Sequence, residues 1–280
     1  PSDKAALAGD RVPNLGIITS YNDMLSAHQP LETYPQLIKQ AARDAGIKEV
    51  VFAEHIDFGM PVGSDFTVDF AAYETAFEQT RREFPELNIR RGIEAGLDLR
   101  YKDEMAALLN AHPCDFVIGS LHLVFRHDPY YEDVWRQYSQ REIYDEYMRL
   151  SLETARSCGY YDILGHLGYI SKFCPFEDKM LRYGDYADAV DELLKTLIGR
   201  GKALEVNTNG LYMTPSTMPE TAIIKRYYEL GGELLTVGSD AHYEIVVGHA
   251  VAETLDALKS IGFKYVCAFD NRKPRFINIP

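Results

Sequence analysis

Several features that would place this protein in other classes are missing from its sequence. It has no run of 18 apolar residues, and no basic stretch followed by an apolar one opens the chain, so we expect neither a membrane span nor a secretory signal. Basic residues number 29 against 42 acidic ones, and the net charge of −13 argues against a nucleic-acid partner. The expected location is the cytosol, with no membrane association.

Cysteine pairs and a glycine-rich phosphate loop are also missing. The four cysteines show no CxxC spacing and are expected to be reduced and mostly buried: Cys114, Cys158, Cys174 and Cys267. No glycine-rich fingerprint follows the first expected strand, which weakens a nucleotide-binding interpretation. The remaining composition, 46% hydrophobic and 25% charged over 280 residues, suits a globular protein. Without a break in composition, we expect one domain over residues 1–280.

Apolar segments of strand length alternate with segments of helical periodicity about seven times. The expected strands are Leu15–Thr19, Ile47–Ala53, Ile89–Ala95, Cys114–Leu123, Tyr161–His166, Ala203–Asn207 and Glu233–Val237, with shorter pieces at Lys264–Phe269 and Arg275–Ile277. The expected helices are Glu32–Ala45, Phe66–Phe84, Lys102–Ala111, Glu142–Cys158, Tyr186–Arg200, Pro219–Leu230 and Ala250–Ile261. This α/β alternation predicts a parallel sheet covered by helices, and seven units favour a barrel over a doubly wound sheet.

Side chains that can bind metal recur at the ends of five expected strands. The clearest case is Leu234–His242, where an apolar run ends in Gly-Ser and is followed by an Asp and a His two residues apart. The full set is His55, Glu94, His122, His166, Asp240 and His242. In a parallel barrel all strand carboxyl ends open on one face. Imidazole and carboxylate groups are costly to bury unless paired or metal-bound, so the set predicts a multinuclear metal site.

Each of these residues alone also has an ordinary explanation. His122 or His166 could be a hydrogen-bonded core histidine, and Glu94 could be a buried ion-pair partner of Arg90 or Arg91. Core packing does not readily explain six such residues at the same ends of five strands.

Neighbouring polar residues have less specific interpretations. Glu54 and Asp57 flank His55, where either could orient a ligating imidazole or face solvent. His112 and His127 lie at a helix end and in a loop, and are expected to be solvated.

A further group of residues could contact a substrate. Lys172, Arg126 and Arg100 lie near strand ends and could bind phosphate oxygens, although each could equally be a surface charge. His249 begins the last helix and could contact substrate, but a surface or capping role is the favoured interpretation. The aromatic segment Tyr130–Trp135 could cover a substrate ring, but packing against the barrel is the favoured interpretation.

From about Ile47 onward the chain resembles the polymerase-and-histidinol-phosphatase (PHP) superfamily, and within it the histidinol-phosphate phosphatases. The segments that carry the resemblance are Glu54–Phe58 (EHIDF), Gly92–Gly96 (GIEAG), Gly119–His122 (GSLH), Asp162–Leu167 (DILGHL), Glu205–Gly210 (EVNTNG) and Gly238–His242 (GSDAH). The resemblance implies a distorted seven-stranded (β/α)7 barrel of the TIM-like kind. It also implies hydrolysis of a small phosphate monoester, L-histidinol phosphate, with up to three divalent ions of Zn, Mn or Fe.

The resemblance also implies how the ligands are shared. Glu94, His122 and His166 would hold one ion, Glu94 and Asp240 a second, and His55 and His242 a third. The catalytic residues would be Glu94, Asp240 and His242, which hold the ions at the reacting phosphate. Adjacent cations neutralise the charge of an in-line phosphoryl transfer.

The first strand departs from the family pattern. The family has His-x-His followed by Thr there, whereas this chain reads Gly16-Ile17-Ile18-Thr19. The family's later Asp or His is replaced by Met24, with Asp23 one residue short and His28 nearby. Two ligands of the second ion are therefore missing, and we expect one or two metals rather than three.

Residues 2–46 resemble another family, the 6-phosphogluconate dehydratases, most clearly over Leu15–Pro30 (LGIITSYNDMLSAHQP). The cluster-binding cysteines of those enzymes have no counterpart here, so dehydratase activity is not expected. The chain is interpreted as a chimera joined near Gly46, whose first part supplies the first strand and helix of the barrel.

The sequence is compatible with three functions. The first is a phosphatase impaired by the loss of His-x-His. The second is an inactive barrel with residual metal, and the third, ranked last, is a sugar-acid-binding module. The sequence does not indicate an oligomeric state.

Overall fold

A computed structural model describes residues 15–19, 49–61, 66–242 and 246–280, the first of these ranges by its backbone alone. Within these residues, seven strands form one parallel sheet in chain order. They are β1 (Leu15–Thr19), β2 (Glu49–Ile56), β3 (Asn88–Gly96), β4 (Phe116–Ser120), β5 (Ile163–Leu164), β6 (Ala203–Asn207) and β7 (Leu235–Gly238). The sheet curls so that β1 and β7 approach each other, but in the described residues no ladder joins them. The expected helix Glu32–Ala45 lies outside the described residues.

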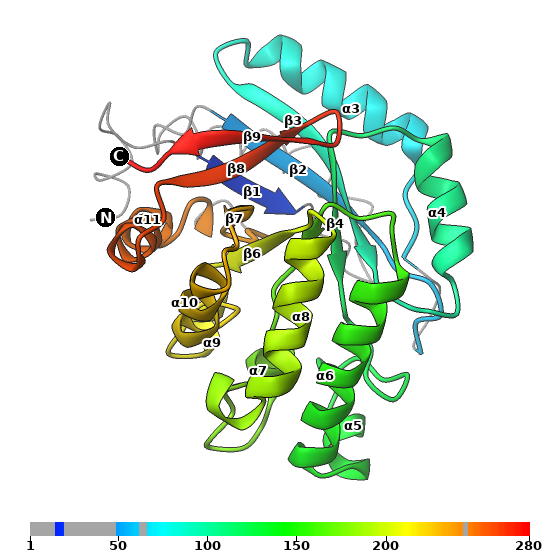
Figure 1. The fold of residues 1–280 in the computed structure, drawn as a ribbon. Coiled ribbons are helices and arrows are strands. Elements are labelled where there is room, and N and C mark those ends of the chain that lie inside the picture. Colours follow the sequence, from blue (N-terminus) through cyan, green and yellow to red (C-terminus); the bar gives the residue numbers. More distant parts are fainter. Residues whose placement is uncertain (1–14, 20–48, 62–65, 243–245) are drawn as a thin grey trace.

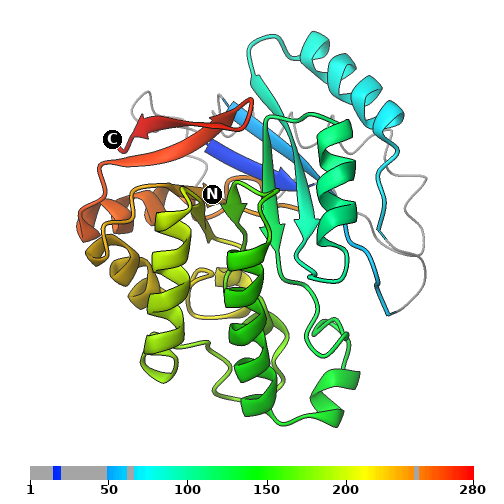
Figure 2. The ribbon, with the colours of Figure 1, turned by 45° about the vertical axis from the view of Figure 1, so that its right-hand side comes forward.

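Helices cover the outer face of the curled sheet (Figures 1 and 2). The longer ones are α3 (Phe70–Glu83), α4 (Lys102–Ala111), α6 (Gln140–Ser157), α8 (Ala187–Gly199), α10 (Thr221–Glu229) and α11 (Val251–Ile261). Short helical segments lie between them: α5 (Asp133–Gln137), α7 (Ile170–Phe173), the 3₁₀ turn Tyr183–Asp185 and α9 (Gly210–Met213). No helix in the described part of the chain combines the length and apolar character that crossing a bilayer requires.

Strand periodicity divides the core into an outer and an inner part. Outward positions such as Ile93, Val117 and Val206 pack with the helices in the largest apolar cluster. Inward positions form a second cluster: Val51, Ala53, Phe116, Ile118, Ile163 and Ala203. The inward rows then turn polar toward the carboxyl ends of the strands, where Ala53 is followed by His55 and Ala203 by Glu205. Within the sheet, the inward-facing residues are therefore apolar at the start of the strands and polar at their carboxyl ends.

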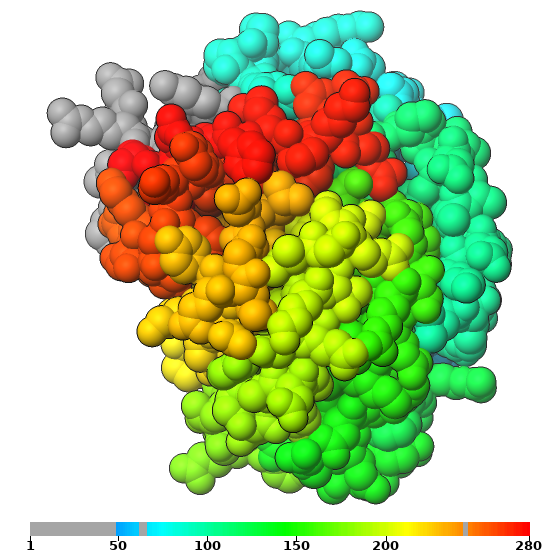
Figure 3. Space-filling model, viewed as in Figure 1, coloured from blue at the N-terminus to red at the C-terminus, as the bar shows by residue number. Residues whose placement is uncertain are grey.

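A C-terminal hairpin completes the inner apolar cluster. Strands β8 (Tyr265–Asp270) and β9 (Lys273–Asn278) pair antiparallel, and Cys267, Ala268 and Phe269 join the inner cluster. Asn271 and Arg272 occupy the turn with φ of 49° and 64°, the left-handed geometry of a tight hairpin. The red hairpin lies between the cyan α3 region and the green and orange helices in Figure 3. The sequence predicted the two short strands but not their pairing.

Capping explains where two helices differ from their predicted bounds. The helix expected from Phe66 begins at Phe70, because the Asp69 side chain accepts a hydrogen bond from the Ala72 backbone N–H at 3.0 Å. The helix expected from Glu142 begins two residues earlier, because Ser139 and Glu142 form a reciprocal capping box. The four cysteines are free and three of them are buried, as predicted.

Gly92 in β3 is required by the inner packing. A Cβ atom added there would lie 2.0 Å from Cζ of Phe116, whose side chain is buried. We expect Gly92→Ala to destabilise the fold by about 3 kcal/mol, because overpacking forces either the ring or the strand to move. Urea unfolding would measure this. Gly184→Ala is the matched control, since a Cβ added there would meet no atom within 4 Å beyond its own chain neighbours. Equal unfolding midpoints for the two variants would contradict the argument.

An ion pair between α8 and α10 should make stability depend on acid pH. Arg226 donates to both carboxylate oxygens of Asp191, at 2.8 and 2.6 Å, and lowers the pKa of Asp191 from 3.8 to about 2. A lowered carboxyl pKa stabilises the fold above its ordinary value, and this stabilisation is lost as pH falls toward the folded-state value. Asp191→Asn should therefore lower the urea midpoint at pH 7, and the deficit should shrink below pH 3.8. Asp256→Asn on the exposed face of α11 is the control. A deficit that stays constant with pH would contradict the assignment.

Candidate metal centre

Two adjacent strands bring the first pair of predicted ligands together. His55 on β2 and Glu94 on β3 occupy paired positions in the parallel register, so both point inward. The His55 Nε2 atom lies 3.4 Å from Oε2 of Glu94. Glu94 is only 2% exposed, and Arg90 and Arg91 pair with other carboxylates, of Asp270 and Glu74. The core ion-pair explanation of Glu94 is therefore wrong.

The loops after β4 and β5 add two imidazoles. Strand β4 ends at Ser120, so His122 lies in the following loop rather than in the strand predicted to reach Leu123. His122 Nε2 and His166 Nε2 lie 3.2 and 2.9 Å from Oε1 of Glu94, and 3.3 Å from each other. One nitrogen or oxygen atom from each of His55, Glu94 and His122 lies within 4.8 Å of the others. Side chains from β2 and from the loops after β4 and β5 thus converge on the carboxylate of Glu94.

Asp57 orients His122. The residue is 3% exposed, and Oδ1 lies 2.8 Å from Nδ1 of His122, so the carboxylate can hold the imidazole with Nε2 turned toward Glu94. Burial disfavours the ionised form of Asp57, but His122 outweighs it and lowers the pKa to about 2. The sequence had left open whether Asp57 orients an imidazole or faces solvent.

Charge is balanced within the cluster. Burial opposes the protonation of His55, yet Glu94 and Asp57 outweigh it and raise the pKa of His55 to about 9. Burial likewise opposes the ionisation of Glu94, but His55 and the two imidazoles that hydrogen-bond to it hold its pKa well below the ordinary value. The charged forms of the carboxylates and imidazoles in the cluster therefore stabilise one another.

Sequence reasoning did not assign a role to Glu205, although it lies in the inward row of β6. It is 2% exposed, and Oε2 accepts a hydrogen bond from the His166 backbone N–H at 2.7 Å. Burial raises its pKa to about 7. A glutamate at an inward position between Ala203 and Asn207 was the signal that could have identified it. It fixes the backbone that carries His166.

Asp240 and His242 lie beside the same centre. Asp240 has a φ of 46°, a left-handed conformation that turns the chain directly after β7. Its Oδ1 lies 3.5 Å from Nδ1 of His242, whose ring centroid is 6.1 Å from that of His55. Burial disfavours ionisation of Asp240, but His242 and Lys172 outweigh it and lower its pKa.

The donor chemistry fits a divalent metal. The imidazole nitrogens of His122 and His166 face each other and share one carboxylate oxygen, an arrangement that a cation would satisfy better than a proton. Nε2 of His55 is buried and makes no hydrogen bond in the described residues. Buried polar atoms normally have partners, so an imidazole left without one beside a carboxylate is the geometry expected of a metal ligand.

The residues considered for substrate contact lie in different places. Lys172 is close enough to influence Asp240. Arg126 and Arg100 line a cleft of about 390 Å³ with Glu146, outside the cluster of imidazoles. The His249 ring lies 4.2 Å from that of Tyr212.

The aromatic segment Tyr130–Trp135 both packs and reaches the surface. Trp135 is 9% exposed and its indole N–H donates to the Pro129 carbonyl at 2.8 Å, whereas Tyr130 is 62% exposed. The expectation of packing therefore describes Trp135 but not Tyr130.

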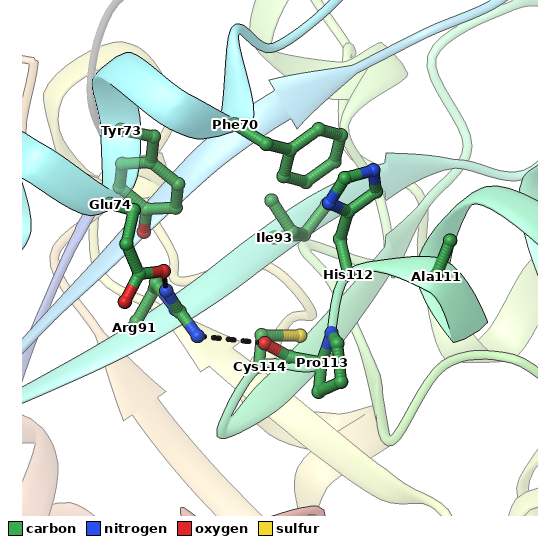
Figure 4. Close-up of a pocket in the computed structure, with 9 residues that line it drawn as sticks. All are labelled: Phe70, Tyr73, Glu74, Arg91, Ile93, Ala111, His112, Pro113 and Cys114. Atoms are coloured by element: carbon green, nitrogen blue, oxygen red, sulfur yellow. Dashed lines mark hydrogen bonds and ion pairs between the residues drawn. The ribbon is translucent and has the colours of Figure 1, made fainter.

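His112 was expected to be solvated, but it is partly buried. Its ring stacks on Phe70 with centroids 3.7 Å apart, beside a small pocket that Glu74, Arg91 and Cys114 also line (Figure 4). The ring contact between α3 and the end of α4 accounts for its partial burial.

Relatives of known class match the two parts of the chain separately. A probable histidinol-phosphatase of Clostridium acetobutylicum is 29% identical over 242 residues, covering 85% of this chain and 93% of that protein. The histidinol-phosphatase of Lactococcus lactis is 29% identical over 231 residues, 81% of this chain and 85% of that one. The phosphogluconate dehydratase of Rhizobium meliloti is 80% identical over 46 residues, only 16% of this chain and 8% of that protein.

A solved structure agrees with the larger match. The histidinol phosphate phosphatase of Lactococcus lactis, in complex with zinc, L-histidinol and phosphate, superimposes with a TM-score of 0.82 at 27% identity. The match covers 94% of this chain and 99% of that one. The PHP domain model matches residues 25–209, well over half of the sequence. This chain therefore belongs to the PHP domain family.

Proposed function

We propose that the protein is a metal-dependent phosphomonoesterase that acts on L-histidinol phosphate. The observation that carries this proposal is the convergence of three imidazoles on Glu94 at the carboxyl ends of a parallel sheet. It is supported by the similarity to a histidinol phosphate phosphatase that binds zinc, L-histidinol and phosphate.

The proposed ligands are those predicted from the sequence: His55, Glu94, His122, His166, Asp240 and His242. When bound, divalent cations would supply Lewis acidity toward phosphoryl oxygens and lower the pKa of a water molecule. The chain's own residues set the geometry: Asp57 holds the His122 ring, and Glu205 holds the backbone at His166. Glu94 supplies a negative charge to several imidazoles at once, which makes it the centre of the site.

We further propose that residues 1–46 supply the first strand and helix, and that the sheet closes into a distorted seven-stranded barrel within a single domain. Support comes from β1, which pairs with β2 in parallel from Leu15 to Thr19. Deleting residues 1–46 should then lower the melting temperature, because β2 would lose its neighbour. An unchanged melting temperature would make the segment dispensable.

Phosphate release from L-histidinol phosphate, with Zn²⁺, Mn²⁺ or Fe²⁺ added in turn, tests the function. The expected result is metal-dependent but weak turnover, with one or two ions per chain. Three tightly held ions would contradict the expected loss of a site. Metal binding without any phosphate release would favour the alternative, an inactive chimeric barrel with residual metal.

A further inference from the structure

A cleft on the outer side of the sheet is separate from the metal centre. It has a volume of about 390 Å³ and lies between the middle of α6 and the segment that leads into α4, on the side of the molecule where Figure 1 labels these two helices. None of the proposed metal ligands lines it. Sites for small molecules in proteins begin at about 300 Å³, so this cleft is large enough to hold one.

The walls of this cleft are mostly apolar. Leu97 and Leu121 are buried and belong to the outer core cluster. The other apolar side chains that line the cleft are half-buried: Leu99, Leu123, Phe125, Tyr138 and Leu150. Apolar surface that remains in contact with water along one concave wall favours the binding of an apolar chain, which removes that surface from water.

A strained turn forms one wall of the cleft. Val124 and His127 exchange two backbone hydrogen bonds of 2.9 Å, and the residues between them, Phe125 and Arg126, have φ of 51° and 65°. A tight turn with two left-handed positions favours Asn-Gly, because most side chains are disfavoured there. The Phe125 ring stacks on that of Tyr138 with centroids 4.0 Å apart. Backbone strain is concentrated where proteins hold ligands, and here it fixes an aromatic wall beside a guanidinium group.

The charges that line the cleft leave one cation without a partner in the described part of the chain. Both carboxylate oxygens of Asp98 accept hydrogen bonds from Nε of Arg100 at 3.0 Å, and Glu146 accepts from Arg149 at 2.7 and 2.6 Å. The exposed side chain of Arg126 forms no hydrogen bond or ion pair with any residue that the structure describes. The cleft therefore combines apolar walls with one available positive charge.

We propose that this cleft binds a small amphipathic monocarboxylate, whose carboxylate pairs with Arg126 and whose aliphatic chain covers the leucines. A guanidinium group binds a carboxylate through two parallel N–H···O bonds. The neighbouring carboxylates of Asp98 and Glu146 disfavour a dianion such as a phosphate, so a singly charged ligand fits better. The proposal does not depend on phosphatase activity, because no proposed metal ligand contributes to the cleft.

Calorimetric titration tests the proposal. The zinc-loaded protein would be titrated with octanoate and with its neutral analogue octanamide, at saturating inorganic phosphate so that the metal centre is occupied. We expect the wild-type protein to bind octanoate about tenfold more tightly than octanamide, because only the carboxylate forms charged hydrogen bonds with Arg126. From hexanoate to octanoate, the affinity should rise roughly fourfold for each CH₂ group that the cleft buries.

Three variants separate recognition of charge from apolar binding. Arg126→Gln should reduce the preference for octanoate to less than about twofold and leave the affinity for octanamide unchanged. Leu123→Ser should weaken the binding of both ligands. Arg136→Gln is the control, because it removes an exposed arginine of α5 that pairs with Glu132 outside the cleft, and it should keep the wild-type preference.

Four results would each overturn the proposal. They are the absence of saturable octanoate binding by the wild-type protein, equal wild-type affinities for octanoate and octanamide, an unchanged preference in Arg126→Gln, and wild-type binding of both ligands by Leu123→Ser. Circular dichroism would check that each variant is folded. Failure of phosphate release would overturn the proposed function and leave these affinities as they are.

Discussion

Glu94→Gln is expected to weaken divalent-metal binding severely and, with it, to lower phosphate release. Glu94 lies within 3.4 Å of imidazole nitrogens from His55, His122 and His166 and is 2% exposed. The amide keeps the size of the side chain but removes the negative charge. Even outer-shell partners of a ligand contribute 10- to 100-fold to metal affinity, so losing this charge should lower zinc affinity by more than about 100-fold.

Zinc titration with a chromophoric competitor would measure the change, and circular dichroism would check that the variant is folded. Glu94→Asp retains the charge on a shorter side chain and should bind with intermediate affinity. Glu192→Gln, which removes a surface carboxylate paired with Arg156, should bind as the wild-type protein does. Wild-type affinity in the Glu94→Gln variant would mean that the cation binds elsewhere.

Restoring two histidines to β1 should raise both metal content and turnover. The family pattern suggests positions 16 and 18, but the register of β1 against β2 is different. Ile17 and Thr19 lie opposite Val51 and Ala53, the inward row that leads to His55, whereas Ile18 lies opposite Phe52, which packs in an outer cluster. A shift of one residue exchanges the faces of a strand, so positions 17 and 19 are the ones that continue the inward row.

We therefore expect the pair Ile17→His and Thr19→His to add one bound ion and to increase phosphate release by roughly 100-fold, on the scale by which ligand environments alter metal sites. The pair Gly16→His and Ile18→His is the matched control, with the same composition on the other face. Elemental analysis and phosphate release would be measured for both. Rescue by the control pair alone would show that β1 is displaced by one residue from the described register.

The sequence predicted the order of the sheet and its polar rim because both follow from local pattern. Apolar runs bounded by helical segments identified β2, β3, β6 and β7. The positions at or just past the ends of three of these strands then identified His55, Glu94 and Asp240 as candidate ligands. Long periodic segments such as α6 were located to within two residues at their start. Local pattern was sufficient to predict this rim, because the carboxyl ends of all parallel strands lie on the same face of the sheet, whichever strands are neighbours.

What the sequence did not predict depends on contacts between distant segments. The pairing of Asp57 with His122 spans 65 residues, and no local motif distinguishes it from an exposed aspartate. The ladder of β5 covers only Ile163–Leu164, and the following Gly165 packs so closely on β4 that a Cβ there would lie 2.4 Å from Oγ of Ser120. The face presented by β1 likewise depends on register, which hydrophobic pattern cannot fix in a strand of five residues.

The C-terminal hairpin also has a consequence for biosynthesis. Arg272 at its tip binds Asp162 and the Tyr160 carbonyl at the start of β5, while Phe269 packs beneath the inner side chains of β2 and β4. During translation all seven strands of the sheet leave the ribosome before this hairpin does. The nascent chain therefore exposes Val51, Phe116 and their neighbours until residues 265–278 have emerged, and docking of the hairpin is the step that shields them from water.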